Sequence, residues 1–219
     1  QLARQQALPE RAELARRLNR PVRLACDRRQ TFASTRMRSA TVSRIRTALS
    51  AEGRILARDT DTLIDIGAYV TGGNYLPGSM LQRHVRLYDI PAERYHGRAV
   101  YTNTPPTGAF RGYGSPQINA AGEISLDIAA TRAGLDPVAV RLLNAIHPGA
   151  VEPYSNLPVG NARLHDCLRQ GAESFRWTAR RAAPRDSGRW RRGVGMAAAA
   201  HVNGCFPGSE ESTTMSLAL

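Results

Sequence analysis

The sequence predicts an α+β fold in which helices pack against mixed sheets. Residues 40–49 and 55–66 alternate apolar and polar side chains on either side of Gly53, as two strands of a hairpin do. Residues 117–133 repeat apolar side chains every three or four positions, the spacing of an amphipathic helix. With 219 residues and 42% hydrophobic side chains, the chain can form a sizeable core.

The elements before and after the hairpin are expected as follows. Residues 9–19 form a helix, because Pro9 suits a first turn and an apolar face follows it. Residues 22–26 alternate and indicate a strand, and Asp27 then begins a turn or a helix. After the hairpin we expect a short helix within residues 76–87 and a strand over 94–102.

The second half of the chain is expected to be mainly helical at first. The stripe of the 117–133 helix consists of Ile118, Ala121, Ile124, Ile128 and Ala129. Gly134 ends this helix, and Asp136 caps the next one, which runs from Pro137 to about residue 146. The remaining segments are a loop at 148–162, a helix at 161–175, an exposed arginine-rich connection at 178–192, a buried strand at 194–202, a turn at 204–208 and the first half of a strand at 212–219.

The stretch Thr104–Gln117 has the composition of a ligand-binding loop. It contains one arginine, two aromatic side chains and three glycines between a Pro-Pro pair and a Pro-Gln helix start. Glycine lets the backbone come close to a bound group, and arginine offers a fixed fork of donors to an anion. The alternative is an ordinary tight connection from a strand to a helix.

The charge of the chain is strongly positive, at +12. All 30 basic residues are arginine, and they are spread along the chain. A nucleic-acid site has no reason to avoid lysine, so coding bias explains the composition better. No apolar run reaches the length of a membrane span, and no leader is visible.

The titratable side chains form no recognisable catalytic or metal motif. Cys26, Cys167 and Cys205 are far apart, so we expect buried free thiols in a reducing, cytoplasmic compartment rather than a metal site. The five histidines lack ligand spacing. Glu123 and Asp127 lie four residues apart; they suit acid/base work or, more commonly, the polar edge of a helix.

Motifs in a fixed order carry a resemblance. Ala109–Gln117 reads Ala-Phe-Arg-Gly-Tyr-Gly-Ser-Pro-Gln, and Gly134-Leu135-Asp136-Pro137 follows it. Together with residues 19–28, 65–69, 88–91 and 102–105, they resemble the large, molybdopterin-binding subunit of the molybdenum hydroxylases, the xanthine dehydrogenase and aldehyde oxidase group. The resemblance implies part of the molybdopterin-binding domain, in a bacterial-type subunit.

The resemblance also implies an activity and its partners. These oxidoreductases hydroxylate a carbon of an N-heterocycle or an aldehyde, with water as the oxygen source, on a molybdenum–molybdopterin cofactor. Iron–sulfur clusters and FAD are expected on other domains or subunits, and the remainder of the large subunit is expected as a partner. Residues 77–80 lack the arginine that xanthine-specific members place before Tyr-x-Ile-Pro, which disfavours xanthine as the substrate.

Site residues follow from the same motif. Phe110, Arg111 and Gly112 match cofactor-binding positions. Tyr113 matches an aromatic that packs on the substrate, and Phe206 is assigned as a second one. No catalytic residue and no metal ligand is assigned, because the family's base and its earlier glycine-rich motif have no match here. This chain alone is therefore expected to be inactive.

The chain is divided into residues 1–147, which carry the Arg111 loop and its helices, and 148–219, a loop, a helix and the start of a further β segment.

Other functions remain open at this point. A non-enzymatic basic module that binds nucleic acid or acts as a docking scaffold is the alternative function, based on the arginines of 178–192. A degenerate, inactive family member is a third possibility.

Overall fold

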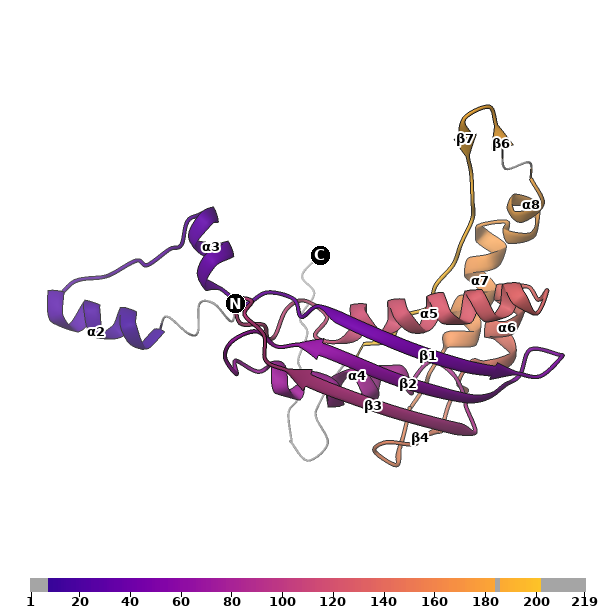
Figure 1. The fold of residues 1–219 in the computed structure, drawn as a ribbon, viewed down its shortest axis with the longest axis horizontal. Coiled ribbons are helices and arrows are strands. Elements are labelled where there is room, and N and C mark those ends of the chain that lie inside the picture. The colour runs from indigo at the N-terminus through magenta and orange to yellow at the C-terminus, as the bar shows by residue number, and fades with distance from the viewer. Residues whose placement is uncertain (1–7, 184–185, 202–219) are drawn as a thin grey trace, which may run out of the picture. The chain divides into compact units, whose positions relative to one another are not determined.

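A computed structural model describes residues 8–183 and 186–201 of the chain. Its main sheet has three strands in the order β1-β2-β3, with β1 at Thr41–Leu49, β2 at Ile55–Asp65 and β3 at Ala92–Val100 (Figure 1). All three match strands expected from the sequence, and the α+β class is confirmed.

The sheet is mixed, since β1 runs opposite to β2 and β3 in Figure 1. β1 and β2 are joined by the expected turn, in which Gly53 has a φ of 92° and the Ser50 amide donates to the Arg54 carbonyl at 2.8 Å. Between β2 and β3 the chain forms η1, Gly73–Tyr75, and α4, Leu76–His84. Parallel neighbours need such a crossover.

The N-terminal segment contains two helices and no strand. α2, Leu8–Leu18, confirms the first predicted helix, and α3, Arg28–Ser34, begins at Asp27 in a capping box with Gln30. The strand predicted at 22–26 is wrong, because those residues have no assigned secondary structure. An alternating pattern forms a strand only where a neighbouring strand accepts its hydrogen bonds.

Two compact units divide the chain by contacts, and β1, β2 and β3 each contribute residues to both. The first unit consists of Gln1–Val42, Thr62–Pro77 and Gly97–Tyr113. The second consists of Ser43–Asp61, Gly78–His96 and Gly114–Leu219. The boundary that the sequence suggests at residue 147 stays a prediction.

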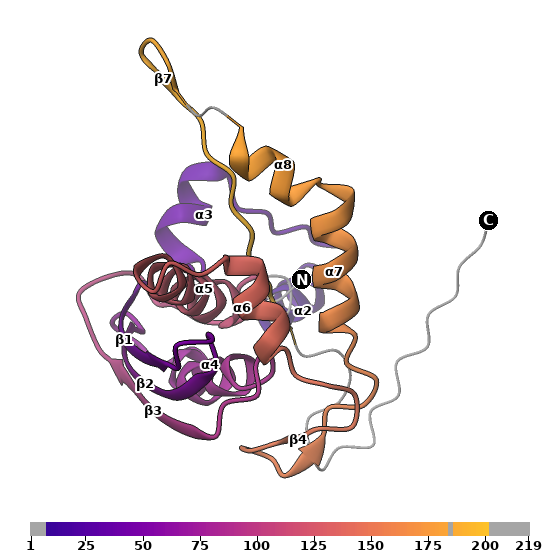
Figure 2. The ribbon, with the colours of Figure 1, turned by 90° about the vertical axis from the view of Figure 1, so that its right-hand side faces the viewer.

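The core of the second unit forms around two consecutive helices. α5, Ser115–Arg132, is followed by α6, Pro137–Asn144, whose N-cap Asp136 accepts from the Val138 and Ala139 amides. α6 lies between α5 and α7, Leu164–Ser174 (Figure 2). The buried cluster consists of Ile55, Leu87, Tyr88, Leu126, Ala130, Val140, Leu168 and Ala198.

The stripe predicted for α5 is wrong in its orientation. Ile118 is buried, but Ile124 and Ile128 are 60% and 49% exposed. The buried residues of the helix are instead Ser115, Ile118, Asn119, Glu123, Leu126 and Ala130, of which Ser115, Asn119 and Glu123 are polar. The three polar side chains can occupy buried positions because each makes at least one hydrogen bond there.

The last segments are short. Residues 151–158 form a small hairpin of β4, Val151–Glu152, and β5, Leu157–Pro158, within the predicted loop. α8, Trp177–Ala182, and a hairpin of β6, Asp186–Ser187, with β7, Trp190–Arg191, lie in the arginine-rich connection. The described part of the strand predicted at 194–202 has no assigned secondary structure, and the turn at 204–208 and the strand at 212–219 lie outside the described residues.

The cysteine prediction is only partly right. Cys26 and Cys167 are free thiols, but both are exposed, because Cys26 lies in the stretch that forms no strand and Cys167 borders a cavity. Cys205 lies outside the described residues. None of the helices found between residues 8 and 201 is long and apolar enough to cross a membrane.

Candidate functional site

The loop singled out by the sequence is held along one side by an extended stretch before β1. The Met37 amide donates to the Pro106 carbonyl, and the Gly108 amide donates to the Met37 carbonyl, both at 3.3 Å. The hydroxyls of Ser39 and Thr107, both buried, lie 2.6 Å apart. These bonds tie the base of the loop to residues far away in the sequence.

A second segment holds the loop from another direction. The Thr71 hydroxyl donates to the Thr107 carbonyl at 2.8 Å, and the Tyr113 hydroxyl donates to the Gly72 carbonyl. A Cβ on Gly108 would lie 2.6 Å from the Thr71 carbonyl oxygen and 2.8 Å from Cδ of Arg36. Only glycine fits here, because the backbones approach too closely for any side chain.

Asp65, at the end of β2, organises the entry to the loop. Its carboxylate accepts from the Gly67 amide at 2.7 Å, from the Thr102 hydroxyl at 2.6 Å and from the Thr104 hydroxyl at 3.0 Å. Burial alone would raise the pKa of Asp65, but these hydrogen bonds outweigh it and hold the pKa below its usual value. The ionised carboxylate therefore fixes the start of the loop.

Four of the five site residues predicted from the sequence, at positions 110–113, lie in one turn. The Tyr113 amide donates to the Phe110 carbonyl at 2.8 Å, and Gly112 has a φ of 81°. Phe110 is 45% exposed, Arg111 is exposed and Tyr113 is half-buried. Phe206 lies outside the described residues. The turn thus presents a guanidinium and an aromatic ring next to a glycine whose positive φ favours glycine.

Sequence reasoning missed Arg38, which contacts two of these residues. Its guanidinium donates to the Arg111 carbonyl at 2.6 Å and lies 4.9 Å from the centre of the Phe110 ring. A guanidinium over an aromatic face is attracted by the ring. The alternation of Arg36, Met37 and Arg38 could have indicated this role from the sequence, because it places both arginines on one side of an extended segment.

The donor set of this turn fits a flat, anionic cofactor. Arg111 offers planar, charged donors to phosphate or to polar ring atoms. The exposed face of Phe110 suits a flat ring, and Gly112 admits a close approach to the backbone. Phe110, Arg111 and Gly112 are therefore the residues that would hold such a group.

From the sequence, Glu123 suited acid/base work or the polar edge of a helix. In the structure it is buried and lies on the inner face of α5. It is 4% exposed and accepts from the Tyr88 hydroxyl at 2.6 Å, from Arg141 Nε at 2.8 Å and from the Ala198 amide at 2.6 Å. Burial alone would lower the pKa of Arg141, but the Glu123 carboxylate raises it above the usual value. Through these bonds Glu123 connects α5 to Tyr88, to α6 and to the segment around Ala198.

The same face of α5 holds the chain near residue 200. Asn119 donates to the Ala200 carbonyl at 2.9 Å, and the Ser115 hydroxyl lies 2.6 Å from Nδ1 of His201. Ser115, Asn119 and Glu123 are spaced by four residues, so they form one row along the helix. The row begins two residues after Tyr113 in the sequence.

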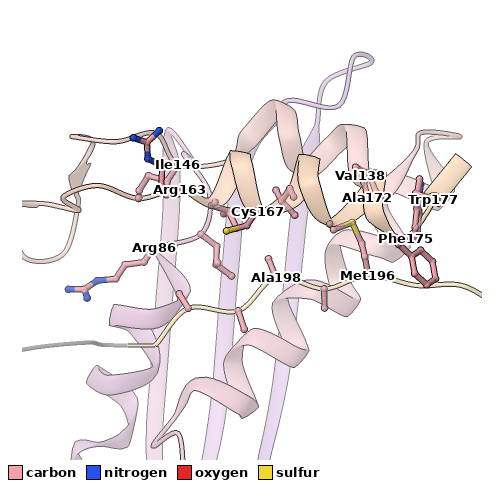
Figure 3. A pocket seen from close by; sticks show the side chains of 18 of the residues that line it. Arg86, Val138, Ile146, Arg163, Cys167, Ala172, Phe175, Trp177, Met196 and Ala198 are labelled. Carbon is pink, nitrogen blue, oxygen red and sulfur yellow. The ribbon is translucent and has the colours of Figure 1, made fainter. Parts of the chain in front are cut away.

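An apolar cavity of about 620 Å³ lies within the second unit (Figure 3). α7 and residues 195–200 line it, with Arg86 and Arg163 at one end of the view and Phe175 and Trp177 at the other. Its lining is mostly apolar and includes none of the predicted site residues. A polar cofactor would find few hydrogen-bond partners here, so the loop remains the candidate site.

Histidine does not form a metal site in the described part of the chain. His84 is buried, its Nε2 lies 3.0 Å from the Thr60 hydroxyl, and Arg58 donates to its carbonyl at 2.8 Å. No group of three or more histidine, cysteine, aspartate or glutamate side chains among residues 8–183 and 186–201 has the geometry for a metal ion.

Comparison with known proteins gives a consistent result. Residues 10–145 match the model of the molybdopterin cofactor-binding domain. The chain is 36% identical to the xanthine dehydrogenase molybdenum-binding subunit of Escherichia coli O157:H7 over 188 residues, which cover 85% of this chain and 25% of that protein. It is 32% identical to the aldehyde oxidoreductase of Megalodesulfovibrio gigas, covering 84% of this chain and 20% of that one.

Solved structures agree with the sequence comparison. Quinoline 2-oxidoreductase from Pseudomonas putida 86 superposes with a TM-score of 0.67 and 27% identity, covering 77% of this chain and 22% of that one. The chain thus spans about a quarter of the length of the curated relatives it matches.

Proposed function

Because the chain belongs to the molybdopterin cofactor-binding domain family, we propose that it forms one part of a molybdenum hydroxylase of the xanthine dehydrogenase and aldehyde oxidase type. The observation that supports this most directly is the turn at residues 110–113, which lies inside the matched region and exposes Phe110 and Arg111. The substrate class is an N-heterocycle or an aldehyde.

Each residue of the turn has a proposed role. Arg111 donates to polar or anionic atoms of the cofactor, Phe110 packs against its flat part, and Gly112 lets the backbone approach it. Tyr113 orients the substrate ring, and its hydroxyl bond to the Gly72 carbonyl fixes the direction of its own ring. Phe206 is proposed as the second aromatic at the substrate.

The bound molybdenum cofactor would supply the two-electron oxidation of a substrate carbon, with the new oxygen derived from water. This chain's part is to bind and to orient, because its described residues include no base at the turn. Iron–sulfur and flavin domains or subunits are proposed to take the electrons, and the rest of the molybdenum-binding subunit is proposed to complete the site. The proposal includes a cytoplasmic location.

The reaction class can be tested directly in the intact subunit with its electron-transfer partners. The enzyme is incubated with aromatic N-heterocycles and aldehydes, a dye as electron acceptor, and water that carries a heavy oxygen isotope. We expect a hydroxylated heterocycle, or a carboxylic acid from an aldehyde, that contains the heavy isotope. A product whose new oxygen comes from molecular oxygen, or no turnover across the panel by a molybdenum-loaded enzyme, would overturn the proposal.

A further inference from the structure

Residues 194–201, here called the 194–201 segment, have no assigned secondary structure but have the burial pattern of an extended strand. Val194, Met196, Ala198 and Ala200 are buried or half-buried, while Gly195, Ala197 and Ala199 are exposed. Met196, Ala198 and Ala200 belong to or pack against the core of the second unit. The period of two is that of a sheet strand with one face buried.

One edge of this segment is already bonded to α5. The Ala198 amide donates to Glu123 at 2.6 Å, and the Ala200 carbonyl accepts from Asn119 at 2.9 Å. In an extended chain the N–H and C=O of one residue point to the same edge, and neighbouring residues alternate between edges. Ala197 and Ala199 therefore present their backbone groups to the opposite edge.

That opposite edge lacks partners within the part of the chain that the structure describes. There, no backbone–backbone hydrogen bond involves any residue of the 194–201 segment. The exposed side chains beside it are small, a glycine and two alanines, so another backbone can approach closely. An open edge of this kind is a template for another strand.

We propose that the 194–201 segment receives a β-strand from the part of the molybdenum-binding subunit that lies outside this chain. This rests on the proposed function, which makes the chain part of that subunit. Two observations support this occupant. The match covers 25% of a curated relative, so most of such a subunit is further polypeptide. The open edge offers backbone groups and small side chains, which recognise an extended backbone rather than a charged or bulky ligand.

The added strand would complete a sheet directly beside the row of α5 that begins at Ser115. The segment would then be fixed on both edges, on one by side chains of α5 and on the other by a backbone ladder. Because Ser115 follows the turn of Arg111 and Tyr113 by only a few residues, this strand would couple the remainder of the subunit to the helix that starts at the proposed cofactor loop.

Amide hydrogen exchange in the intact molybdenum-binding subunit tests the proposal residue by residue. We expect Ala197 and Ala199 to exchange at least about a hundredfold more slowly than an unstructured chain. Ala198 is the internal control, because its bond to Glu123 lies within the chain. Protected Ala198 with freely exchanging Ala197 and Ala199 would overturn the proposal, and so would rapid exchange at all three.

The same measurement separates the other occupants. Protection that rises with protein concentration would assign the edge to a second copy, and equal protection in the 219-residue chain alone would place the partner within the chain itself. Either result contradicts the proposal. If Ala197 and Ala199 are protected in a subunit that contains no molybdenum, the added strand is supported although the proposed function fails. The failure of the proposed function is therefore distinguishable from the failure of the strand proposal.

A substitution gives a second test. Ala199→Pro removes one amide from the open edge, and we expect at least a tenfold loss of protection at Ala197 while the amide of the buried Leu126 stays protected. Arg192→Pro, an exposed position just before the segment, is the matched control and should leave Ala197 unchanged. Unchanged protection at Ala197 in Ala199→Pro would contradict an added strand.

Discussion

Arg38 donates a hydrogen bond of 2.6 Å to the carbonyl oxygen of Arg111, a residue 73 positions later in the chain. The same guanidinium lies 4.9 Å from the centre of the Phe110 ring. One side chain thus fixes both the backbone and the aromatic ring of the proposed cofactor turn. Its effect on the cofactor would be indirect, through the conformation of Phe110 and Arg111.

The first prediction concerns this contact. A hydrogen bond from a charged donor contributes about 1.5–3 kcal/mol, and a cation–π contact adds about 0.5–1 kcal/mol. In the intact subunit Arg38→Ala should therefore release the cofactor at least about tenfold faster, measured as molybdenum lost during dialysis. Arg38→Lys should rescue it only partly, because an ammonium lacks the planar fork.

Arg44→Ala is the matched control for that experiment, since Arg44 is an exposed arginine on β1. It should retain molybdenum as the unmodified protein does. Equal cofactor loss in the Arg38 and Arg44 variants would remove the positioning role of Arg38 and leave only an effect of net charge.

The second prediction concerns the buried junction at Glu123. Glu123→Ala leaves the fully buried Arg141 guanidinium without its main counter-charge and the Ala198 amide without an acceptor. Removing one member of a buried ion pair costs about 3–5 kcal/mol. Urea unfolding should show this loss in the free energy of unfolding.

Asp127→Ala is the matched comparison, because Asp127 contacts the same Arg141 at 2.7 Å from a position 39% exposed. An ion pair with an exposed partner contributes roughly 0–1 kcal/mol, so this variant should be much less affected. Similar losses in the two variants would show that the network does not depend on Glu123.

The third prediction uses two glycines with similar positive φ angles. Gly67 has a φ of 73° and Gly149 has a φ of 78°. A Cβ at Gly67 would lie 2.4 Å from the Pro105 carbonyl oxygen, whereas one at Gly149 would have no atom within 4 Å. Both alanine variants carry the left-handed penalty of about 1–2 kcal/mol, and only Gly67→Ala adds a clash with the loop backbone.

Thermal unfolding separates the two effects. Gly67→Ala should lower the melting temperature by clearly more than Gly149→Ala does, and the difference measures the clash alone. Equal shifts would mean that the backbone of Pro105 does not pack against Gly67 as described.

The fourth prediction concerns pH. Burial, and in second place the Arg58 guanidinium, hold the pKa of His84 well below its usual value, so the folded protein keeps this histidine neutral. The unfolded chain binds a proton near the ordinary pKa of about 6.5, which means that it binds more protons than the fold does below that pH. His84 therefore makes stability fall as the pH falls below about 6.5.

His84→Gln keeps a polar side chain and removes the group that binds a proton in the unfolded chain. The loss of unfolding free energy between pH 7.5 and pH 5.5 should become smaller in the variant. The nearby Glu93 carboxyl has a pKa raised by burial, which acts in the opposite direction as the pH falls; both proteins contain Glu93, so the comparison between them isolates His84. An unchanged difference between the two pH values would contradict the role given to His84.

Local patterns in the sequence predicted most of the secondary structure. The hairpin around Gly53 and the helix that starts after Asp136 carry their own signals, because turn glycines and helix caps act within a few residues. The strands predicted at 22–26 and 194–202 failed for a non-local reason. Residues 22–26 alternate and residues 194–202 are apolar and small, but a strand also needs a neighbour, which no local pattern specifies.

The candidate site was predictable as a motif but not as a structure. Phe110, Arg111, Gly112 and Tyr113 are consecutive, so the sequence shows them together. Arg38 and Gly72 contact that turn, and Asp65 holds the entry to its loop; only the fold brings these residues to it. Glu123 was misjudged because an acidic residue on a helix is usually exposed, whereas here three donors satisfy it in the interior.

The molybdenum content of the intact subunit, purified from a host with an active cofactor pathway, tests the central claim most directly. We predict stoichiometric molybdenum and pterin in the unmodified protein and a marked loss of both in Arg111→Ala, with the fold of both proteins intact by circular dichroism. An intact, folded subunit without molybdenum, or an Arg111→Ala variant that retains full molybdenum and pterin, would contradict a cofactor site at this loop.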